Sequence, residues 1–583
     1  MPTGVLSDLR FSRIVRRMKN QILLAQLATA FTRRVRKLSA PIIVRSTSPH
    51  YFVNRASPLF KIFFIQSLGH GSAVAVAALM LGFAGQAEAA VRTWTGLGGT
   101  GNWSTSANWD TGAPQNNDSL VFNNGTANSE TTNNVVGRTL SSLTFAGSGS
   151  GIHLHGNGIT LTGGIGASHS VATPIIFLDL TLATNNQTFT LSGSAVLDFF
   201  GNVNLNGQNL SVSVTDPANA LIFDGVISGA GNITKTLGAG AVYFTGTASN
   251  TYVGTTTVNA GLIFAAKSPG VISIPGDVVI GNASATDTLR LGNDNQIAAT
   301  ANVFVNSGGL FDLNGLSNTV ASVTFVDGGT VQTLATGELK LGGPVTLNGV
   351  GTSASISGHL HLGTSSKTFT VTNTGSALTV SAVIAGGNSG SPFFIAGGVT
   401  KSGAGNLILS AANLFAGPVT VNDGTLQVNN NLALGTPGAV SINHDPTTMV
   451  NSNAVLLLNN AHVTNEVLTL NSLNTNGALQ VNSTGDWIGP IALQTNVFIE
   501  ASSLLQLGGV ISGPGGFTKV NFSTLALVGT GVNTYAGTTT VNGGTLLLSR
   551  TGNLGGTIPG ALVITAARCG SEQTRKFIPW RKR

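Results

Sequence analysis

The sequence contains very little cysteine and very little charge. Its 583 residues include one cysteine, Cys569, so no disulfide within the chain and no thiolate metal site can stabilise it. Only 8% of the residues are charged, whereas an ordinary soluble domain has about 25%. Low charge suits closely stacked strands, because like charges in register on neighbouring strands would repel each other across about 4.8 Å.

Helix-forming stretches are scarce as well. Short runs of Val, Leu, Thr and Phe are interrupted every few residues by Gly, Asn or Ser, and the chain contains 77 glycines. This pattern predicts a nearly all-β protein. One β-sandwich takes about 100 to 250 residues, so roughly 475 repetitive residues without a visible linker favour a solenoid instead. Coils of about 20 to 25 residues would give about twenty coils and a rod roughly 90 to 100 Å long.

One phrase, Asn-x-Tyr-x-Gly followed by Val-Asn-x-Gly, occurs three times with small variations, each time after a Thr-Lys pair. In the second copy Val419 and Val421 share one face of a strand, and Asn422-Asp423-Gly424 forms a turn before the next strand. The turn asparagines of successive units could also bond to one another as a ladder. We expect a structural role for these positions: Lys235, Asn250, Tyr252, Gly254, Asn259 and Gly261; Lys401, Asn413, Phe415, Gly417, Asn422 and Gly424; Lys519, Asn533, Tyr535, Gly537, Asn542 and Gly544.

These three copies resemble the autotransporter-associated β-strand repeat, which is found in passenger regions of bacterial surface and secreted proteins. A block from Trp94 to Phe122, which includes Trp103 and Trp109, resembles the start of many such proteins. The similar phrasing extends from about residue 93 to residue 564. We therefore expect a right-handed, single-stranded parallel β-helix, or β-solenoid, with the tryptophan block as a cap that shields its first coil.

The formal net charge of +7 comes from the two ends of the chain. Twelve of the 28 Lys and Arg residues lie at or before Lys61, and six lie at or after Arg568. Between residues 90 and 567, ten basic residues face eighteen acidic ones, so this part is mildly acidic. No basic stripe interleaved with aromatic residues occurs within the repeats, and we expect no nucleic-acid partner.

The basic N-terminal region predicts export. An apolar run over residues 73–84 follows Lys61 and leads to Ala87-Glu-Ala89, which is typical of a signal peptide cleaved between Ala89 and Ala90. The alternative is an uncleaved membrane anchor, for which the apolar run is short. Residues 1–58 are too long for a usual basic leader, and they represent either an extended leader or, as we favour, a start codon assigned too far upstream.

The C-terminal residues depart from the family. The repeat pattern ends near Ile564, and residues 568–583 resemble neither a translocating barrel nor a sorting signal. A frameshift or a truncated gene would explain this tail, and we expect the outer-membrane translocator not to be encoded in this chain. The expected organisation is a basic leader (1–58), a signal peptide (59–89), a cap region (90–130), a β-helix (131–567) with repeats near 225–264, 383–428 and 509–548, and a basic tail (568–583).

Three patterns are candidates for chemistry. The eighteen acids are scattered with no Asp-Asp pair, which argues against the clustered carboxylates of polysaccharide-cleaving β-helices. Ser389, in the segment 387–392, resembles the nucleophile loop of trypsin-like proteases, but it lies in an insertion and no suitable histidine motif precedes it. We expect a surface loop there. The pairs His153/His155 and His359/His361 each place two imidazoles on one face of a strand, where a third ligand would be needed to hold zinc.

We therefore expect a non-enzymatic, secreted or cell-surface protein for structural display or adhesion, without a cofactor or metal. Its expected partner is a surface polysaccharide or the surface of a host or neighbouring cell. The alternatives are a polysaccharide-degrading β-helix enzyme and an inactive fragment of a truncated autotransporter.

Overall fold

The computed structural model describes residues 89–565, except 184, 284–286, 387–396, 436–446, 465 and 552–556. The chain divides into two units, Met1–Ala84 and Gly85–Arg583, and all the described residues lie in the second. Within these residues the structure contains strands, one short 3-10 turn, η1 (Ser106–Asn108), and no α-helix. None of the described segments is a helix of the length and apolarity that a bilayer crossing requires.

The strands form three faces of a coil, and every strand pair within a face is parallel. The first face has 19 strands among the described residues: β1 (Val91–Trp94), β2 (Ser119–Asn124), β5 (Ser142–Gly147), β8 (Ile165–Ala167), β11 (Gln187–Leu191), β14 (Leu210–Val214), β17 (Ile233–Leu237), β19 (Thr256–Val258), β21 (Val278–Ile280), β23 (Asn302–Asn306), β26 (Ser322–Val326), β29 (Val345–Leu347), β32 (Lys367–Val371), β35 (Val399–Ser402), β37 (Val419–Val421), β39 (Thr447–Ser452), β42 (Val467–Ser472), β45 (Ile491–Leu493) and β48 (Ile511–Ser512).

The second face has 20 strands in the same described part: β3 (Glu130–Asn133), β6 (His153–Gly156), β9 (Ile175–Ile176), β12 (Val196–Phe199), β15 (Ala220–Phe223), β18 (Ala241–Phe244), β20 (Leu262–Ala265), β22 (Asp287–Leu291), β24 (Gly309–Asp312), β27 (Gly329–Gln332), β30 (Ser353–Ser357), β33 (Ala377–Val380), β36 (Asn406–Leu409), β38 (Thr425–Val428), β40 (Val455–Leu458), β43 (Leu479–Val481), β46 (Val497–Glu500), β49 (Phe517–Val520), β51 (Thr539–Asn542) and β53 (Leu562–Ile564).

The third face is interrupted and consists of three groups of strands. They are β4 (Arg138–Leu140), β7 (Ile159–Leu161), β10 (Leu180–Leu182), β13 (Val203–Asn204) and β16 (Ile227–Ser228); β25 (Asn318–Val320), β28 (Leu339–Leu341), β31 (His359–His361) and β34 (Val383–Ala385); and β41 (Ala461–Val463), β44 (Gly485–Trp487), β47 (Leu505–Leu507), β50 (Thr524–Leu527) and β52 (Thr545–Leu548).

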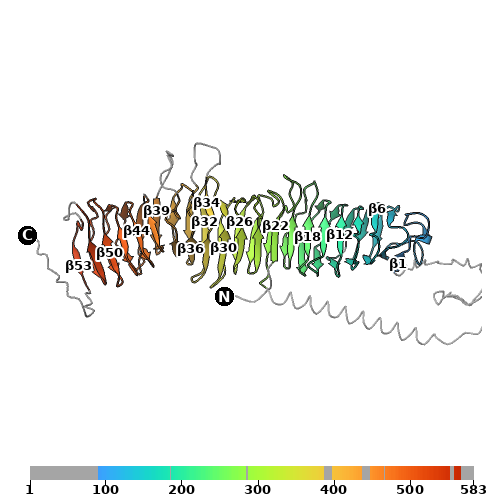
Figure 1. Ribbon diagram of the computed structural model, residues 1–583, viewed down its shortest axis with the longest axis horizontal. Coiled ribbons are helices and arrows are strands. Elements are labelled where there is room, and N and C mark those ends of the chain that lie inside the picture. The colour runs from blue at the N-terminus through green and yellow to red at the C-terminus, as the bar shows by residue number, and fades with distance from the viewer. Residues whose placement is uncertain are drawn as a thin grey trace, which may run out of the picture. The chain divides into compact units, whose positions relative to one another are not determined.

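Successive coils of this unit stack along one axis, as Figure 1 shows by the regular succession of strands from β1 to β53. Leu210 of β14 lies opposite Ile233 of β17, one coil further along the chain. Nineteen steps of about 4.8 Å along the second face correspond to a length of roughly 90 Å. The prediction of an all-β parallel solenoid is confirmed.

The core lies inside the coil, because alternate residues of each strand point inward and meet the same position of the next coil. Phe199, Phe223 and Phe244 occupy one such column, with ring centroids 5.1 and 6.0 Å apart. All three rings are fully buried. Aromatic neighbours of this kind add about 0.5–1.5 kcal/mol per pair to the stabilisation from burial.

Three tryptophans cover the first coil. Trp94, Trp103 and Trp109 are all buried and pack edge to face around Trp109, with centroids 5.1 and 6.1 Å from that ring. Each indole N–H donates a hydrogen bond, to Asn128 O, Thr131 Oγ1 and Trp103 O respectively. No buried donor of these rings is left unpaired, so the block is buried at little polar cost.

The three copies of the repeated phrase do not occupy the same face. In the first copy, residues 250–255 lie between β18 and β19 and take the place of a third-face strand, and the second copy does the same between β36 and β37. In the third copy, residues 533–538 lie between β50 and β51 and take the place of a first-face strand. The phrase thus replaces a strand wherever it falls.

Candidate functional site

The first asparagine of each repeat joins three consecutive coils. The side-chain oxygen of Asn250 accepts a hydrogen bond from Ile227 N at 2.9 Å, and its amide donates to Ser273 O at 2.8 Å. Asn413 and Asn533 repeat this arrangement with backbone groups of their own neighbouring coils. Because the segment lacks a strand, these buried amides supply the hydrogen bonds between coils that a strand would otherwise make.

The aromatic residue of each repeat is fully buried, and in the first and third copies its hydroxyl has a hydrogen-bond partner four residues later. The hydroxyl of Tyr252 lies 2.5 Å from Thr256 Oγ1, and Tyr535 lies 2.5 Å from Thr539 Oγ1. The second copy has Phe415 at this position and a buried Val419 in place of the threonine. The two hydroxyls are therefore present together or absent together, which avoids an unpaired buried hydroxyl in every copy.

The lysine of each Thr-Lys pair is buried with its ammonium group against a corner of the coil. Lys235 Nζ donates to Gly238 O at 2.7 Å, Lys401 Nζ to Ser402 O at 2.9 Å, and Lys519 Nζ to Asn521 O at 2.6 Å. Desolvation by burial lowers the pKa of Lys235 and of Lys401 to about 8, although the nearby carboxylates of Asp287 and Asp423 oppose this. Each lysine thus satisfies corner carbonyls that have no strand partner.

The first and third copies are each followed by a second buried cation, Lys267 and Arg550, which was not predicted from the sequence. Lys267 Nζ donates to Thr245 O and to Gly225 O, and Arg550 donates to Gly531 O and Gly509 O. Gly225 and Gly509 begin the two Gly-Val-Ile-Ser-Gly segments that precede the first and third copies. In both cases a basic residue follows the Gly-Val-Ile-Ser-Gly segment by about 40 positions, and this recurrence could have indicated the contact from the sequence.

Two glycines in each copy are required by close approach of backbones. A Cβ on Gly254 would lie 2.0 Å from Gly231 O, and one on Gly537 would lie 2.2 Å from Gly516 N. Gly261, with φ +60°, turns the chain into the next strand, as do Gly424 and Gly544. A Cβ on Gly417 would lie 2.7 Å from Gly397 O of the preceding coil.

The expected ladder of turn asparagines exists at one copy. Asn422 Oδ1 accepts a hydrogen bond from Asn451 Nδ2 at 3.1 Å. In the other two copies the neighbouring coil offers a different partner: Asn259 accepts through its backbone carbonyl from Asn282, and Asn542 Oδ1 accepts from Thr565 Oγ1. A ladder needs asparagine at the same register on consecutive coils, and the next coil places Gly281 beside Asn259 and Thr565 beside Asn542.

One histidine pair gains a third polar group from the neighbouring coil. Glu130 at the start of β3 pairs in register with His153 of β6 and lies 2.7 Å from its Nδ1 and 2.8 Å from Nε2 of His155. Desolvation by burial raises the pKa of Glu130, but hydrogen bonds to His155 and His153 outweigh it, and the pKa lies below its usual value. Glu130 precedes His153 by 23 residues, which is about one coil, and this spacing was the sequence signal for their contact.

The second histidine pair, His359 and His361, does not gain a third ligand among the described residues. His361 is buried on β31 and its Nδ1 accepts a hydrogen bond from Gly363 N at 2.9 Å. Among the described residues, the set Glu130, His153 and His155 is the one group of three or more His, Cys, Asp or Glu side chains close enough to hold a metal ion.

An aromatic strip continues from this cluster along the outer surface. We define it as His155, Phe177 and Phe200, on three consecutive coils. The rings of His155 and Phe177 are stacked at 4.5 Å, and Phe177 lies 5.2 Å from Phe200. Phe177 and Phe200 are 40% and 48% exposed, which is unusual for phenylalanine.

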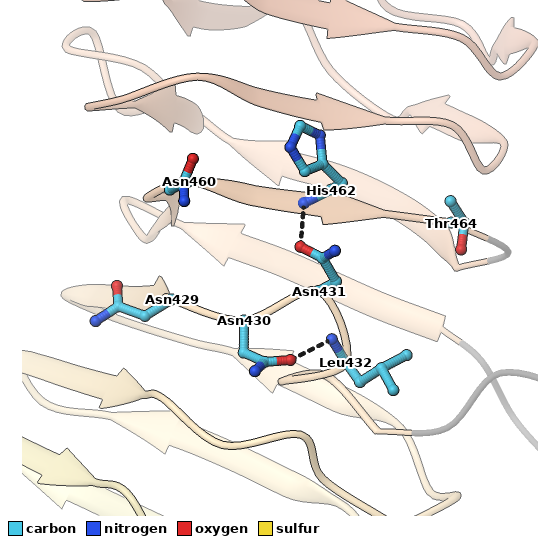
Figure 2. A pocket seen from close by; sticks show the side chains of 7 residues that line it. All are labelled: Asn429, Asn430, Asn431, Leu432, Asn460, His462 and Thr464. Carbon is cyan, nitrogen blue, oxygen red and sulfur yellow. Dashed lines mark hydrogen bonds between the residues drawn. The ribbon is translucent and has the colours of Figure 1, made fainter.

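A polar hollow of about 580 Å³ lies on the turns that follow β38 and flank β41. Figure 2 shows Asn431 reaching across it to the backbone N–H of His462, a hydrogen bond of 2.9 Å. The imidazole of His462 points away from Asn431 in Figure 2. Its Nδ1 lies 3.0 Å from Asp486 Oδ1. The hollow is lined by Asn429, Asn430, Asn431, Leu432, Asn460, His462 and Thr464, and its amides can bond hydroxyl groups.

The comparisons agree with the repeat geometry. The passenger-associated-transport-repeat family matches residues 234–263, 399–428 and 517–548, the three copies described above. The chain therefore carries three passenger-associated-transport repeats. It is also 31% identical, over 243 residues, to the adhesin BmaC autotransporter of Brucella suis biovar 1 (strain 1330). That match covers 41% of this chain and 6% of the relative. No solved structure matches the chain.

Among the described residues, the carboxylates do not form a group of three or more. Asp198 is half-buried, and desolvation together with the charge of Asp224 raises its pKa to about 6. No third carboxylate joins this pair within the part of the chain that the structure describes. Ser389 and the segment around it lie outside the described residues, as do Ala87 and the C-terminal tail.

Proposed function

We propose that this passenger-type repeat protein is a non-enzymatic adhesive rod that is displayed on the cell surface or secreted. The similarity to an autotransporter adhesin supports this proposal. A continuous stack of coils repeats its outward side chains at intervals of about 4.8 Å, so that many weak contacts act together through avidity. The adhesion partner we propose is a surface polysaccharide.

The aromatic strip is the observation that carries this proposal. Exposed aromatic rings in a row are rare on soluble proteins, and contiguous apolar surface generally marks a site of interaction. The flat rings of Phe177 and Phe200 match the apolar C–H faces of pyranose sugars, and Glu130 and Asp198 at the same surface can accept hydrogen bonds from hydroxyl groups.

The test uses the full chain on immobilised polysaccharides and on bacterial or host cells under flow. The double variant Phe177→Ser/Phe200→Ser should lose retention, whereas the control Phe522→Ser, which removes a phenylalanine that is 71% exposed elsewhere, should keep it. Equal retention of both variants would contradict the assignment of the strip. Release of reducing ends from a bound polysaccharide would contradict the non-enzymatic proposal and favour the enzyme alternative.

Export is part of the same proposal. The segment 59–89 would act as a signal peptide, and the rod would begin at Ala90. N-terminal sequencing of the exported protein should give Ala90 as the first residue. A mature protein that retains residues 59–89 would favour the membrane-anchor alternative instead.

A further inference from the structure

The cluster of Glu130, His153 and His155 has the geometry of a metal site. His153 and His155 lie two residues apart on β6, so both side chains point outward, and Glu130 is the register partner of His153 on β3. Their candidate ligand atoms, one from each residue, all lie within 4.8 Å of one another. The three residues come from two hydrogen-bonded strands, so the backbone fixes their relative positions before any ion binds.

The donor set is one that zinc prefers. Two imidazoles and one carboxylate are the protein ligands of a tetrahedral Zn²⁺ site whose fourth position is open. With bonds of about 2.0–2.1 Å, a tetrahedral ion holds its ligand atoms about 3.4 Å apart. Glu130 Oε1 lies 2.7 Å from His153 Nδ1 and Glu130 Oε2 lies 2.8 Å from His155 Nε2. Rotations of these partly exposed side chains would bring one carboxylate oxygen and the two nitrogens, which lie within 4.8 Å of one another, to that spacing.

The surroundings favour a held and accessible ion. Stacking on Phe177, with the two ring planes only 9° apart, restricts the imidazole of His155. The side chains of His153, His155 and Glu130 are 32%, 39% and 60% exposed, so water can reach the open position. We propose that Glu130, His153 and His155 bind Zn²⁺ through His153 Nδ1, His155 Nε2 and a Glu130 oxygen, with the fourth position open to solvent. The site shares Glu130 and His155 with the surface proposed for adhesion, but binding of Zn²⁺ does not require the adhesive function.

Zinc binding to the full chain tests the proposal directly. The experiment uses full-length protein that is prepared without a histidine tag and with the substitution Cys569→Ser, so that neither a tag nor the thiol contributes ligands. Titration calorimetry with Zn²⁺ alone should show one equivalent bound per chain, and Co²⁺ should give the absorption bands of a tetrahedral site. Loss of an outer-shell partner costs about 10- to 100-fold in metal affinity, so loss of one of three ligands in His153→Ala, His155→Ala or Glu130→Gln should weaken binding at least as much.

The second histidine pair gives a matched control. His359→Ala/His361→Ala removes the same His-x-His motif from β31, where no carboxylate completes a set among the described residues. This variant should bind Zn²⁺ like the parent. Equal binding by the parent and the three cluster variants, equal loss in the control, or no stoichiometric binding by the parent would each overturn the proposal. Far-ultraviolet circular dichroism checks the fold of each variant, and His155→Gln replaces His155→Ala if that variant fails to fold.

Discussion

The paired hydroxyls of Tyr252 and Thr256 provide a quantitative test of how the repeat is stabilised. Tyr252 is 1% exposed and Thr256 is fully buried, and each hydroxyl has the other as its hydrogen-bond partner. Removing one hydroxyl leaves the other without a partner in an apolar site, which costs about 1–3 kcal/mol. We therefore expect Tyr252→Phe and Thr256→Val each to lower the stability of this coil by about that amount.

The double variant should behave differently. Tyr252→Phe/Thr256→Val removes both hydroxyls, and replacing both partners with apolar groups of the same shape is close to neutral. It also reproduces the natural combination of Phe415 and a valine in the second copy. The expected coupling free energy between the two positions is thus about 1–3 kcal/mol.

Hydrogen exchange followed by mass spectrometry measures the effect locally, which matters because a long repeat array need not unfold as one unit. Peptides over residues 250–265 report on the altered copy, and peptides over residues 533–548 of the unaltered third copy serve as an internal control. Additive effects, with a coupling energy within about 0.5 kcal/mol of zero, would refute the reasoning. The reverse change gives an independent check, because Phe415→Tyr alone should destabilise the second copy and Phe415→Tyr/Val419→Thr should restore it.

Two further predictions concern the lysine and the glycine of the repeat. Burial lowers the pKa of Lys401 from 10.5 to about 8. Between these two values the unfolded chain binds more protons than the folded chain, so the free energy of unfolding rises with pH. The denaturation midpoint should therefore increase between pH 8 and 10, and Lys401→Met should reduce that increase. If the slope stays the same in Lys401→Met, the lysine is not its source. Gly254→Ala should destabilise its coil by about 1–3 kcal/mol in the exchange experiment, because the added Cβ meets Gly231 O. The control Gly166→Ala adds a Cβ that meets no atom within 4 Å, and it should change stability by less than about 1 kcal/mol. Similar effects of the two substitutions would contradict a role for close backbone approach.

The sequence alone determined the fold class and the identity of the repeat residues. Alternating apolar residues and glycine turns are local patterns, and they act within a few residues of one another, so strands and corners could be predicted directly. The phrase that contains Asn250, Tyr252 and Gly254 was recognisable because it recurs. Its hydrogen bonds were not predictable, since the partners of Asn250 are backbone groups of two other coils.

Only the tertiary structure decided which residues meet between coils. Coil length varies, so that contacting residues of neighbouring coils are 18 apart at Thr448 and Glu466 but 31 apart at Asn431 and His462. The sequence separation between contacting residues is therefore not constant along the stack. The face on which each copy lies and the carbonyl partners of the buried lysines therefore could not be read from the sequence. The 23 residues between Glu130 and His153 are a typical coil length, and that spacing was the one available signal for their contact.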